Sequence, residues 1–466
     1  MTSPLPLTLN AELSSPRAFR TNLDRVLLYG VVGLLLFGPL AFGAVESWSM
    51  SIMQVGSGLL FALWAAWQVK TGELEIVANP LFVPILFFTG LILWQLATGR
   101  TAYRADTFST ALLYFAYGLL CFLVVQCLHR TSQVKVLAWI FSGYGFTVAL
   151  FALMQGIAPN GKLYWLRSLP SGGWIYGPFV NHNHYAGLME MLTPIPLVIS
   201  LADNVRDSRR ALAALAAAVM ASTIFLSGSR GGMAAFGTQM ALLAGFLITR
   251  RKNRKVALVL CGFLIVAVAL MAWLGGGELM ERLVSMHDGT RTELSSGTRL
   301  TIDRDALKIF AQKPVLGWGL GTFPDIYPQF SNLSTNFQVG PAHNDYLQLL
   351  VETGALGFAT MLCFLLRLFG SAFKKLKHFP ADSNTTVTLA AVLGVTGILV
   401  HSVVDFNLQI PANAALFYVL CTVAAMEARF GRHHHRHSTS TSRGRAVELR
   451  AYDLRPQLST KELEVK

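Results

Sequence analysis

Long apolar runs alternate with short polar connections along the chain. Runs of about 20 apolar residues, the length that crosses a bilayer as a helix, recur twelve times. They cover residues 26–45, 49–68, 80–97, 109–128, 135–157, 184–201, 211–227, 231–249, 255–275, 345–369, 386–407 and 412–428. Because a helix closes its backbone hydrogen bonds within one segment, each run is expected to be a membrane helix. The pattern predicts an all-α polytopic membrane protein with about twelve transmembrane helices.

Composition and charge agree with lipid as the surrounding solvent. Of the 466 residues, 53% are hydrophobic and only 14% are charged, against about 25% charged in soluble domains. The net charge of +13 comes largely from alternate connections, such as the run RRKNRK at 250–255, and from the tail. This is the pattern of cytoplasmic loops that meet anionic membrane lipids, so no nucleic-acid partner is expected. All five cysteines lie in apolar runs and are expected to be buried, without disulfides.

The runs divide the chain into three parts with both termini in the cytoplasm. These are a cytoplasmic N-terminal segment 1–25, a transmembrane domain 26–428 and a basic, disordered cytoplasmic tail 429–466. Two connections on the opposite, periplasmic side are long, 158–183 and 276–344, and loops of that length are usually functional. The second, between the ninth and tenth runs, is predicted to contain a helix from Thr298 to Gln312 and then tight glycine turns in GWGLGTF.

Two arginines on the periplasmic side are candidates for anion binding. Arg230 lies in SGSRGG between two runs; it either snorkels at a glycine turn or joins free backbone N–H groups in a phosphate site. Arg299 lies in SSGTRLTIDRDALKIF. It either pairs with Asp303 one helical turn on or clamps a diphosphate together with Arg230. Arg304, further along the same segment, is a candidate substrate contact.

A histidine stands where the large loop enters the tenth run. His343, in PAHNDYLQLLVETGALG, is suited to act as a general base because its ordinary pKa is near neutrality. Asn344 or Asp345 would cap the helix that follows, and both are candidate substrate contacts. Glu352 lies up to three turns further on, where a carboxylate is either functional or paired.

Two further polar clusters stand at the ends of runs. GPFVNHNHYAG places its polar side chains at the start of the sixth run; they are Asn181, His182, Asn183 and His184. Residues two apart face different sides of a helix, so sugar contacts or helix capping are favoured over a metal site. HSVVDFNLQIPANA adds His401 and Asp405, which orient other groups or pair with each other. Phosphate-loop, dinucleotide, GxSxG and HExxH motifs are absent from the sequence, and neither cofactor nor metal is expected.

Together these segments resemble the O-antigen ligase and polymerase superfamily of bacterial envelope glycosyltransferases. The matching pieces are GPFVNHNHYAG, LSGSRGG, SGTRLTIDRDALKIFAQKPVLGWGLGTFPDIYP, AHNDYLQLLVETGALG and HSVVDFNLQIPANA. The resemblance implies a GT-C-like fold and glycan transfer, without metal or nucleotide, from an undecaprenyl diphosphate carrier to an acceptor such as lipid A core. It implies a site on the periplasmic face of the inner membrane, with active-site roles for Arg230, Arg299 and His343.

Other functions remain open at this stage. Polymerases that extend a glycan and enzymes that glycosylate proteins share these motifs, so the sugar, the acceptor and the oligomeric state are not determined. A twelve-helix secondary transporter would usually show two related halves joined by a long central cytoplasmic loop. Here the long loop is late in the chain and external, which favours the glycosyltransferase interpretation.

Overall fold

The computed structural model describes most of the chain. The described residues are 16–72, 74, 76–169, 174–202, 205–249, 296–333, 339–377 and 383–426. The predicted ninth run, the RRKNRK segment and the tail lie outside these residues. Within them the regular structure is helical, with two isolated β-bridges, Leu163 to Arg167 and Tyr176 to Phe179.

Ten apolar helices of the described residues fall on the predicted runs. Seven are long and apolar enough to cross a membrane: α1 (Pro16–Leu40), α2 (Ser47–Thr71), α4 (Arg104–Cys127), α5 (Thr131–Ile157), α8 (Asp207–Leu226), α9 (Arg230–Thr249) and α14 (Asp345–Leu376). Three are shorter: α3 (Phe82–Ala97), α15 (Ser383–His401) and α16 (Pro411–Ala425). The protein is therefore an all-helical, multi-pass membrane protein, as predicted. Helix α1 begins inside the segment 1–25 that was assigned to a separate N-terminal part.

The sixth predicted run is not one helix. It forms α6 (His182–Leu192) and α7 (Pro194–Ser200), separated at Thr193. The reason is local, because Pro194 and Pro196 have no backbone N–H with which to continue the helical hydrogen bonds. The prediction of a continuous helix over 184–201 is wrong on this point.

Helix α14 is kinked at Gly354, where the backbone has φ 64° and ψ −169°. The chain before GWGLGTF packs against this kink: Ala355 N–H donates to the Pro314 carbonyl at 2.8 Å and Trp318 N–H to the Val351 carbonyl at 3.0 Å. A Cβ at Gly354 would lie 2.4 Å from the Val315 carbonyl, so no side chain fits. Because Gly354 has no side chain, the backbone of the loop can pack directly against the helix at the kink.

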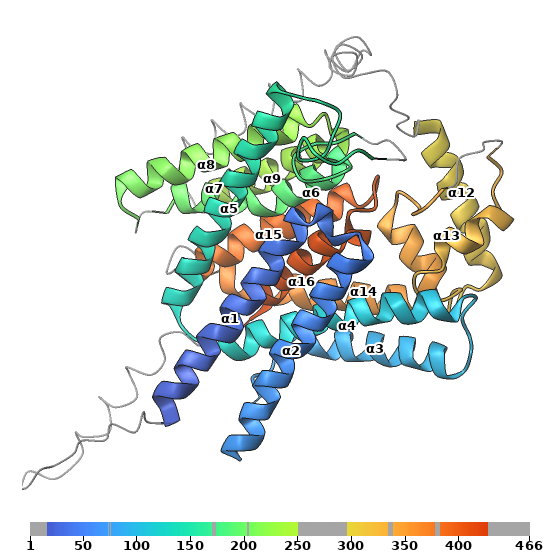
Figure 1. Cartoon of the computed structure of the whole chain (residues 1–466), viewed down its shortest axis with the longest axis horizontal. Coiled ribbons are helices and arrows are strands. Elements are labelled where there is room, and N and C mark those ends of the chain that lie inside the picture. Colours follow the sequence, from blue (N-terminus) through green and yellow to red (C-terminus); the bar gives the residue numbers. More distant parts are fainter. Residues whose placement is uncertain are drawn as a thin grey trace, which may run out of the picture. The chain divides into compact units, whose positions relative to one another are not determined.

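The large loop carries a small apolar core on the first turns of α14. Its elements are α12 (Ser296–Gln312), α13 (Phe323–Ile326) and the 3₁₀ turn η2 (Tyr327–Gln329). Helix α12 confirms the predicted helix, and Figure 1 shows α12 and α13 beside α14. The buried side chains of this core include Ile302, Ile309, Phe323, Tyr327 and Val351. Glycines 317, 319 and 321 have φ of 71°, 117° and 79°, which confirms the predicted tight turns.

The described helices place polar and basic residues at opposite ends. Helices α6, α9 and α14 begin, and α15 ends, around one group of buried polar side chains. Lys375 near the far end of α14 donates to the Val423 carbonyl at the far end of α16. The basic residues before α8 and at the end of α14 therefore lie away from the polar group.

The cysteines largely follow their prediction. Cys121, Cys127 and Cys421 are buried with free thiols. Cys363 also has a free thiol, but it is exposed on α14, which corrects the expectation of burial; in a membrane helix this position meets lipid. Cys261 lies outside the described residues.

Candidate active site

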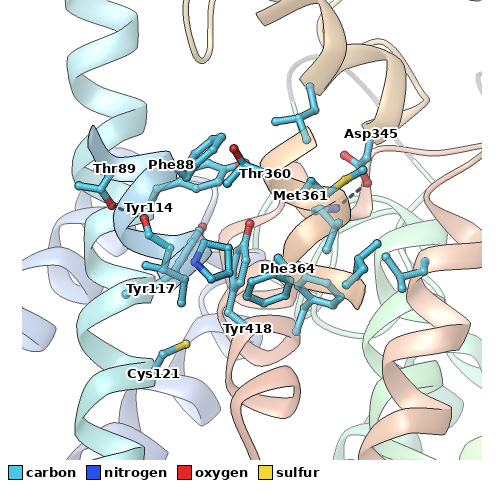
Figure 2. Close-up of a pocket in the computed structure, with 18 of the residues that line it drawn as sticks. Phe88, Thr89, Tyr114, Tyr117, Cys121, Asp345, Thr360, Met361, Phe364 and Tyr418 are labelled. Carbon is cyan, nitrogen blue, oxygen red and sulfur yellow. Dashed lines mark hydrogen bonds between the residues drawn. The ribbon is translucent and has the colours of Figure 1, made fainter. Parts of the chain in front are cut away.

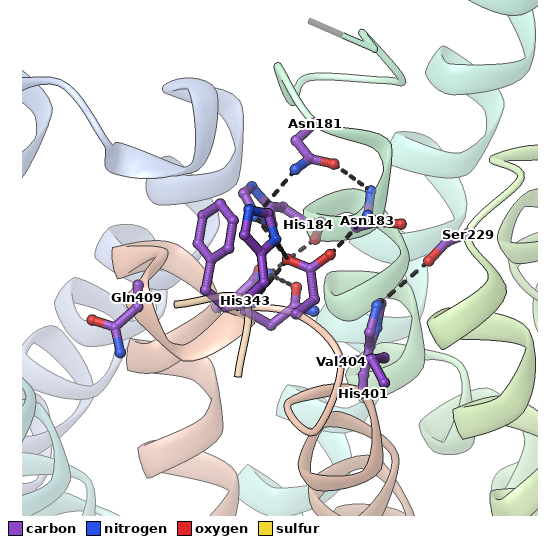
Figure 3. Close-up of polar contacts among 12 residues, drawn as sticks. Asn181, Asn183, His184, Ser229, His343, His401, Val404 and Gln409 are labelled. Carbon is purple, nitrogen blue, oxygen red and sulfur yellow. Dashed lines mark hydrogen bonds and ion pairs between the residues drawn. The ribbon is translucent and has the colours of Figure 1, made fainter. Parts of the chain in front are cut away.

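A single buried carboxylate joins four segments of the chain. Asp405 follows the end of α15 and is 1% exposed. Its Oδ2 accepts a hydrogen bond from Asn183 Nδ2 at 2.8 Å, and Arg299 Nη2 lies 3.8 Å from the same oxygen. Its Oδ1 lies 3.8 Å from both His184 Nε2 and His343 Nδ1. Figure 3 shows the polar contacts around Asn183, His184 and His343. We call these five residues the Asp405 cluster.

The charge of Asp405 is compensated by its neighbours. Burial alone raises the pKa of this carboxyl, but the hydrogen bond and charge of His184, with the charges of His343 and His401, hold the pKa well below its usual range. Burying an ion without such partners would cost several kcal/mol. Asp405 is therefore an ionised centre that faces one guanidinium and two histidine rings.

Arg299 reaches out of α12 to the turn before Asp405. Its Nη1 donates to the Val404 carbonyl at 3.0 Å, in addition to the contact with Asp405. Arg299 therefore pairs with Asp405 in place of Asp303, which was the other alternative. Burial raises the pKa of Asp303, and the Asn344 side chain and the charge of Arg299 offset this only in part. Arg299 thus faces the cluster, and its contact with a diphosphate stays a prediction.

Arg230 is the first residue of α9 and is exposed. No described residue forms a hydrogen bond or ion pair with its guanidinium. The following residue, Gly231, packs on the turn that Arg299 contacts, since a Cβ there would lie 3.0 Å from Val404 Cγ2. The fold therefore brings the backbone next to Arg230 against the turn that Arg299 contacts.

His343 lies immediately before α14 in an unusual backbone conformation. Its φ of 54° is in the left-handed region, which non-glycine residues rarely adopt outside turns and functional sites. Its ring meets Phe406 edge to face at 4.6 Å. Asn344 caps α14 by accepting the N–H groups of Tyr346 and Leu347, each at 3.2 Å, which confirms the capping prediction.

Asp345 has a different role from its neighbour. Its carboxylate accepts the Leu408 N–H at 3.0 Å and the Gln409 side-chain amide at 3.1 Å. These two residues belong to the 3₁₀ turn η3 (Asn407–Gln409), which follows Asp405. The Asp345 carboxylate therefore fixes the chain that follows Asp405, and its predicted contact with substrate stays a prediction.

The start of α6 is organised by capping, as predicted. The Asn181 side chain accepts the Asn183 N–H at 2.8 Å. His182 is buried, and its Nδ1 lies 2.8 Å from the Ser227 carbonyl, whereas the partner of His184 is Asp405. No group of three or more His, Cys, Asp or Glu side chains among the described residues is arranged to hold a metal ion.

A second buried pair contains a residue that the sequence reasoning missed. Glu190 of α6 is fully buried, and its Oε1 lies 2.8 Å from His401 Nδ1. His401 Nε2 lies 3.5 Å from Ser229 Oγ, beside Arg230. The predicted side-chain pairing of His401 with Asp405 is wrong; the two are joined through the backbone, Asp405 N–H to His401 carbonyl. A carboxylate inside the sixth apolar run was the available signal for Glu190.

Comparison with known families places these residues in context. Residues 215–362 match the family model of the O-antigen ligases. The resemblance seen in the sequence is confirmed over this range, which includes Arg230, Arg299 and His343. The family implies an enzyme that acts on lipid-linked glycans as ligase or polymerase. A comparison with curated proteins returns no significant match.

Glu352 also lies in the O-antigen ligase match, but its contacts are structural. Its carboxylate accepts the Gly321 N–H at 2.8 Å, the Phe323 N–H at 3.3 Å and the Gln348 amide at 3.1 Å. It thereby ties the glycine turns of the loop to α14, in agreement with the pairing interpretation. Arg304 is exposed on α12. Substrate contacts for Glu352 and Arg304 stay predictions.

An aromatic pocket lies between α3, α4, α14 and α16. Most of its lining is apolar or aromatic, and Figure 2 shows Phe88, Tyr114, Tyr117, Phe364 and Tyr418 around it. Its polar edge is formed by Asp345 and Gln409. Because Asp345 follows His343 by two residues, the pocket reaches from the membrane-spanning part of the helices to the candidate site.

Proposed function

We propose that this protein transfers a glycan from an undecaprenyl diphosphate carrier to an acceptor hydroxyl at the periplasmic face of the bacterial inner membrane. The observation that carries this proposal is that Asp405 binds Arg299 and lies against His343 at once. An anion-binding cation and a candidate base thus share one buried carboxylate. The O-antigen ligase match and the multi-pass helices support the same conclusion.

The arginines act on the leaving group. In the reaction the bond between the anomeric carbon and the diphosphate breaks, and negative charge develops on the diphosphate. Arg299, held by the Val404 carbonyl and Asp405, and Arg230, at the same turn, stabilise that charge. Two guanidinium groups perform this role without requiring a metal ion.

His343 acts on the acceptor. It accepts the proton of the acceptor hydroxyl at Nε2 as the oxygen attacks the anomeric carbon, which gives direct displacement with inversion. Asp405 lies on the Nδ1 side of the ring and stabilises the imidazolium that forms. The polar start of α6, residues 181–184, is the proposed neighbour of the sugar.

The carrier lipid enters through the aromatic pocket. We place the first isoprene units of the donor tail among Tyr114, Tyr117, Phe364 and Tyr418, since apolar walls favour burial of an apolar chain. The tail then lies at membrane depth while the diphosphate reaches the turn before Asp405.

The proposed topology has twelve membrane helices with both termini in the cytoplasm. Its support is the separation of basic residues from the Asp405 cluster, which agrees with the positive-inside rule. A phosphatase fused after residue 466 is expected to be inactive and one inserted after residue 160 active. The reverse pattern would overturn the orientation.

The first experiment is deletion of the gene in its host, followed by electrophoresis of surface glycans. Loss of long glycan from lipid A core with accumulation of carrier-linked polymer identifies a ligase, whereas single repeat units identify a polymerase. Unchanged glycans would contradict both. Rescue with wild type, but not with the Arg299→Ala variant, is expected.

The matched control for Arg299 is Lys308, on the same helix and paired with Asp305 at 3.1 Å. Lys308→Ala removes an exposed cation from α12 and should rescue like wild type, while Arg299→Ala should insert and fold but lose turnover. A normal rate for Arg299→Ala would remove it from the mechanism. Activity in EDTA is expected to equal that without it; sensitivity to EDTA would point to a metal near His182 and His184.

A further inference from the structure

The turn that carries Arg230 rests on a chain of three buried polar side chains. Glu190 Oε1 contacts His401 Nδ1 at 2.8 Å, and His401 Nε2 lies 3.5 Å from Ser229 Oγ. Ser229 Oγ in turn accepts the Gly232 N–H at 3.1 Å, in the first turn of α9. All three side chains are essentially inaccessible. Figure 3 shows the contact between His401 and Ser229. The chain therefore links α6, α15 and α9 directly beside Arg230.

The glycines after Arg230 allow this chain to approach the backbone. A Cβ on Gly231 would lie 2.6 Å from His401 Nε2, and one on Gly232 would lie 3.0 Å from Glu190 Oε1. The backbone at the start of α9 is thus in contact with both members of the ion pair. A displacement of either member shifts the residue immediately before Gly231, which is Arg230.

The same pair is coupled to the Asp405 cluster. His401 is the last residue of α15, and its carbonyl accepts the Asp405 N–H at 3.1 Å. The side chain of His401 therefore contacts the turn that carries Arg230, while its backbone holds Asp405, whose carboxylate binds Arg299. His401 thus contacts both halves of the candidate diphosphate site, as does Val404 in the same turn.

We propose that Glu190 and His401 are positioning residues that hold Arg230 at a fixed place relative to the Asp405 cluster, so that the two arginines bind one diphosphate. This inference rests on the proposed function and deepens it. Buried ion pairs often add little to stability compared with apolar residues of similar size. Positioning of Arg230 therefore explains the presence of a charged pair inside a membrane protein better than stability does.

A nucleophilic role for Ser229 fits less well. The order Glu190, His401, Ser229 matches the contacts of a hydrolytic triad, but the serine is fully buried and its oxygen is engaged by the Gly232 N–H. Ser229→Ala is expected to keep measurable transfer, with kcat lowered by no more than about tenfold. Complete loss of transfer in a folded Ser229→Ala protein would favour the nucleophile and overturn the positioning role.

The central experiment compares Glu190→Leu, His401→Leu and the double variant in purified protein. Each single change leaves a buried polar partner and is expected to lower thermal stability, whereas the double change restores it. Turnover should stay at least about tenfold below wild type in the double variant, with the KM for acceptor unchanged. Wild-type turnover in a stable double variant would overturn the proposal.

A double-mutant cycle tests whether the pair acts through Arg230. In an Arg230→Ala background the Glu190→Leu/His401→Leu change should lower turnover by less than about twofold, because its target is already missing. An equal loss in both backgrounds would show that the pair acts elsewhere. The control is Gln239→Leu: Gln239 also joins α9 to α6 and α15, through the Glu190 and Leu393 carbonyls at 2.8 and 2.9 Å, but further along α9. It should lower stability and leave turnover near wild type.

A readout independent of transfer separates this proposal from the proposed function. With Cys363 replaced by serine, Arg230→Cys is labelled by a membrane-impermeant maleimide, with and without Glu190→Leu/His401→Leu. The labelling rate should change at least about threefold when the pair is removed; an unchanged rate would overturn the positioning role. If Arg230→Ala transfers glycan normally while labelling still depends on the pair, the proposed function fails and the positioning inference about the turn stands.

Discussion

Two buried carboxylates near the ends of membrane helices differ in their surroundings. Asp405 and Glu352 are 1% and 2% exposed; Glu352 lies within the residues that match the O-antigen ligase model, and Asp405 lies beyond them. Asp405 accepts the Phe406 N–H and the Asn183 amide, each at 2.8 Å, and in addition faces Arg299, His184 and His343 at 3.8 Å. Glu352 is surrounded by backbone N–H groups of the glycine turns and by one amide.

The difference separates a site for chemistry from a structural clamp. Backbone N–H groups are fixed dipoles that cannot exchange a proton with a substrate, so the Glu352 contacts hold the loop against the kink of α14. A guanidinium can bind an anion and a histidine ring can carry a proton, so the Asp405 cluster contains the kinds of group that the proposed transfer requires. For a carboxylate inside a membrane protein, the groups that contact it indicate its role better than its degree of burial does.

The largest effect is expected for the base. His343→Ala should lower the rate of glycan transfer by about 10³-fold or more, since a general base contributes on the order of 10² to 10⁴. The measurement is transfer by purified protein with equal amounts of folded enzyme. His343→Gln, which keeps polarity but cannot accept the proton at neutral pH, should be equally impaired; an active glutamine variant would argue for a binding role instead.

Asp405→Asn should lower transfer at neutral pH by about 10²-fold, because the amide removes the charge that stabilises the imidazolium of His343. Because its folded-state pKa lies below the usual value, Asp405 stays ionised above about pH 5, and the stability it provides is lost only as pH falls through that lowered value. The measurement is the rate of transfer with equal amounts of folded protein. A variant that transfers at the wild-type rate would remove Asp405 from the mechanism.

Glu352→Gln should affect stability and not chemistry. Loss of the carboxylate weakens its bonds to Gly321 and Phe323, with an expected cost of about 1–3 kcal/mol. Thermal unfolding in detergent measures this, and transfer per folded molecule should remain within about twofold of wild type. A stable Glu352→Gln protein that has lost transfer would place Glu352 with Asp405 and remove the distinction between the two carboxylates.

The smallest effect is expected in the aromatic pocket, which extends the comparison to the lipid. Gly118 lines the pocket, and a Cβ there would have room, with Ile85 Cγ2 at an ordinary contact distance of 3.9 Å. Gly118→Leu should raise the KM for an undecaprenyl donor by about fivefold, as expected for the loss of one or two buried methylene contacts, and leave a short-chain donor unchanged. Gly90→Leu on α3 is the control, because Gly90 also has open space but does not line the pocket. Equal effects of the two changes would place the lipid tail elsewhere.

Much of the fold and part of the site follow from the sequence alone. Apolar runs of sufficient length must be helices in lipid, so ten of the predicted runs appear as single helices, and Pro194 is a readable reason for the break between α6 and α7. The capping role of Asn344 is local, since an N-cap bonds N–H groups two and three residues ahead. Motifs likewise singled out Arg230, Arg299 and His343.

The partners of these residues were decided only by the tertiary structure. The sequence offered Asp303 for Arg299 and Asp405 for His401, because helical periodicity reports neighbours within one turn. The fold instead joins Arg299 to Asp405 and His401 to Glu190, residues that lie far apart in the sequence. Such pairs form because charges buried in lipid must find opposite charges wherever packing places them. Local sequence determines which segments become helices, while the packing of those helices determines which charges meet.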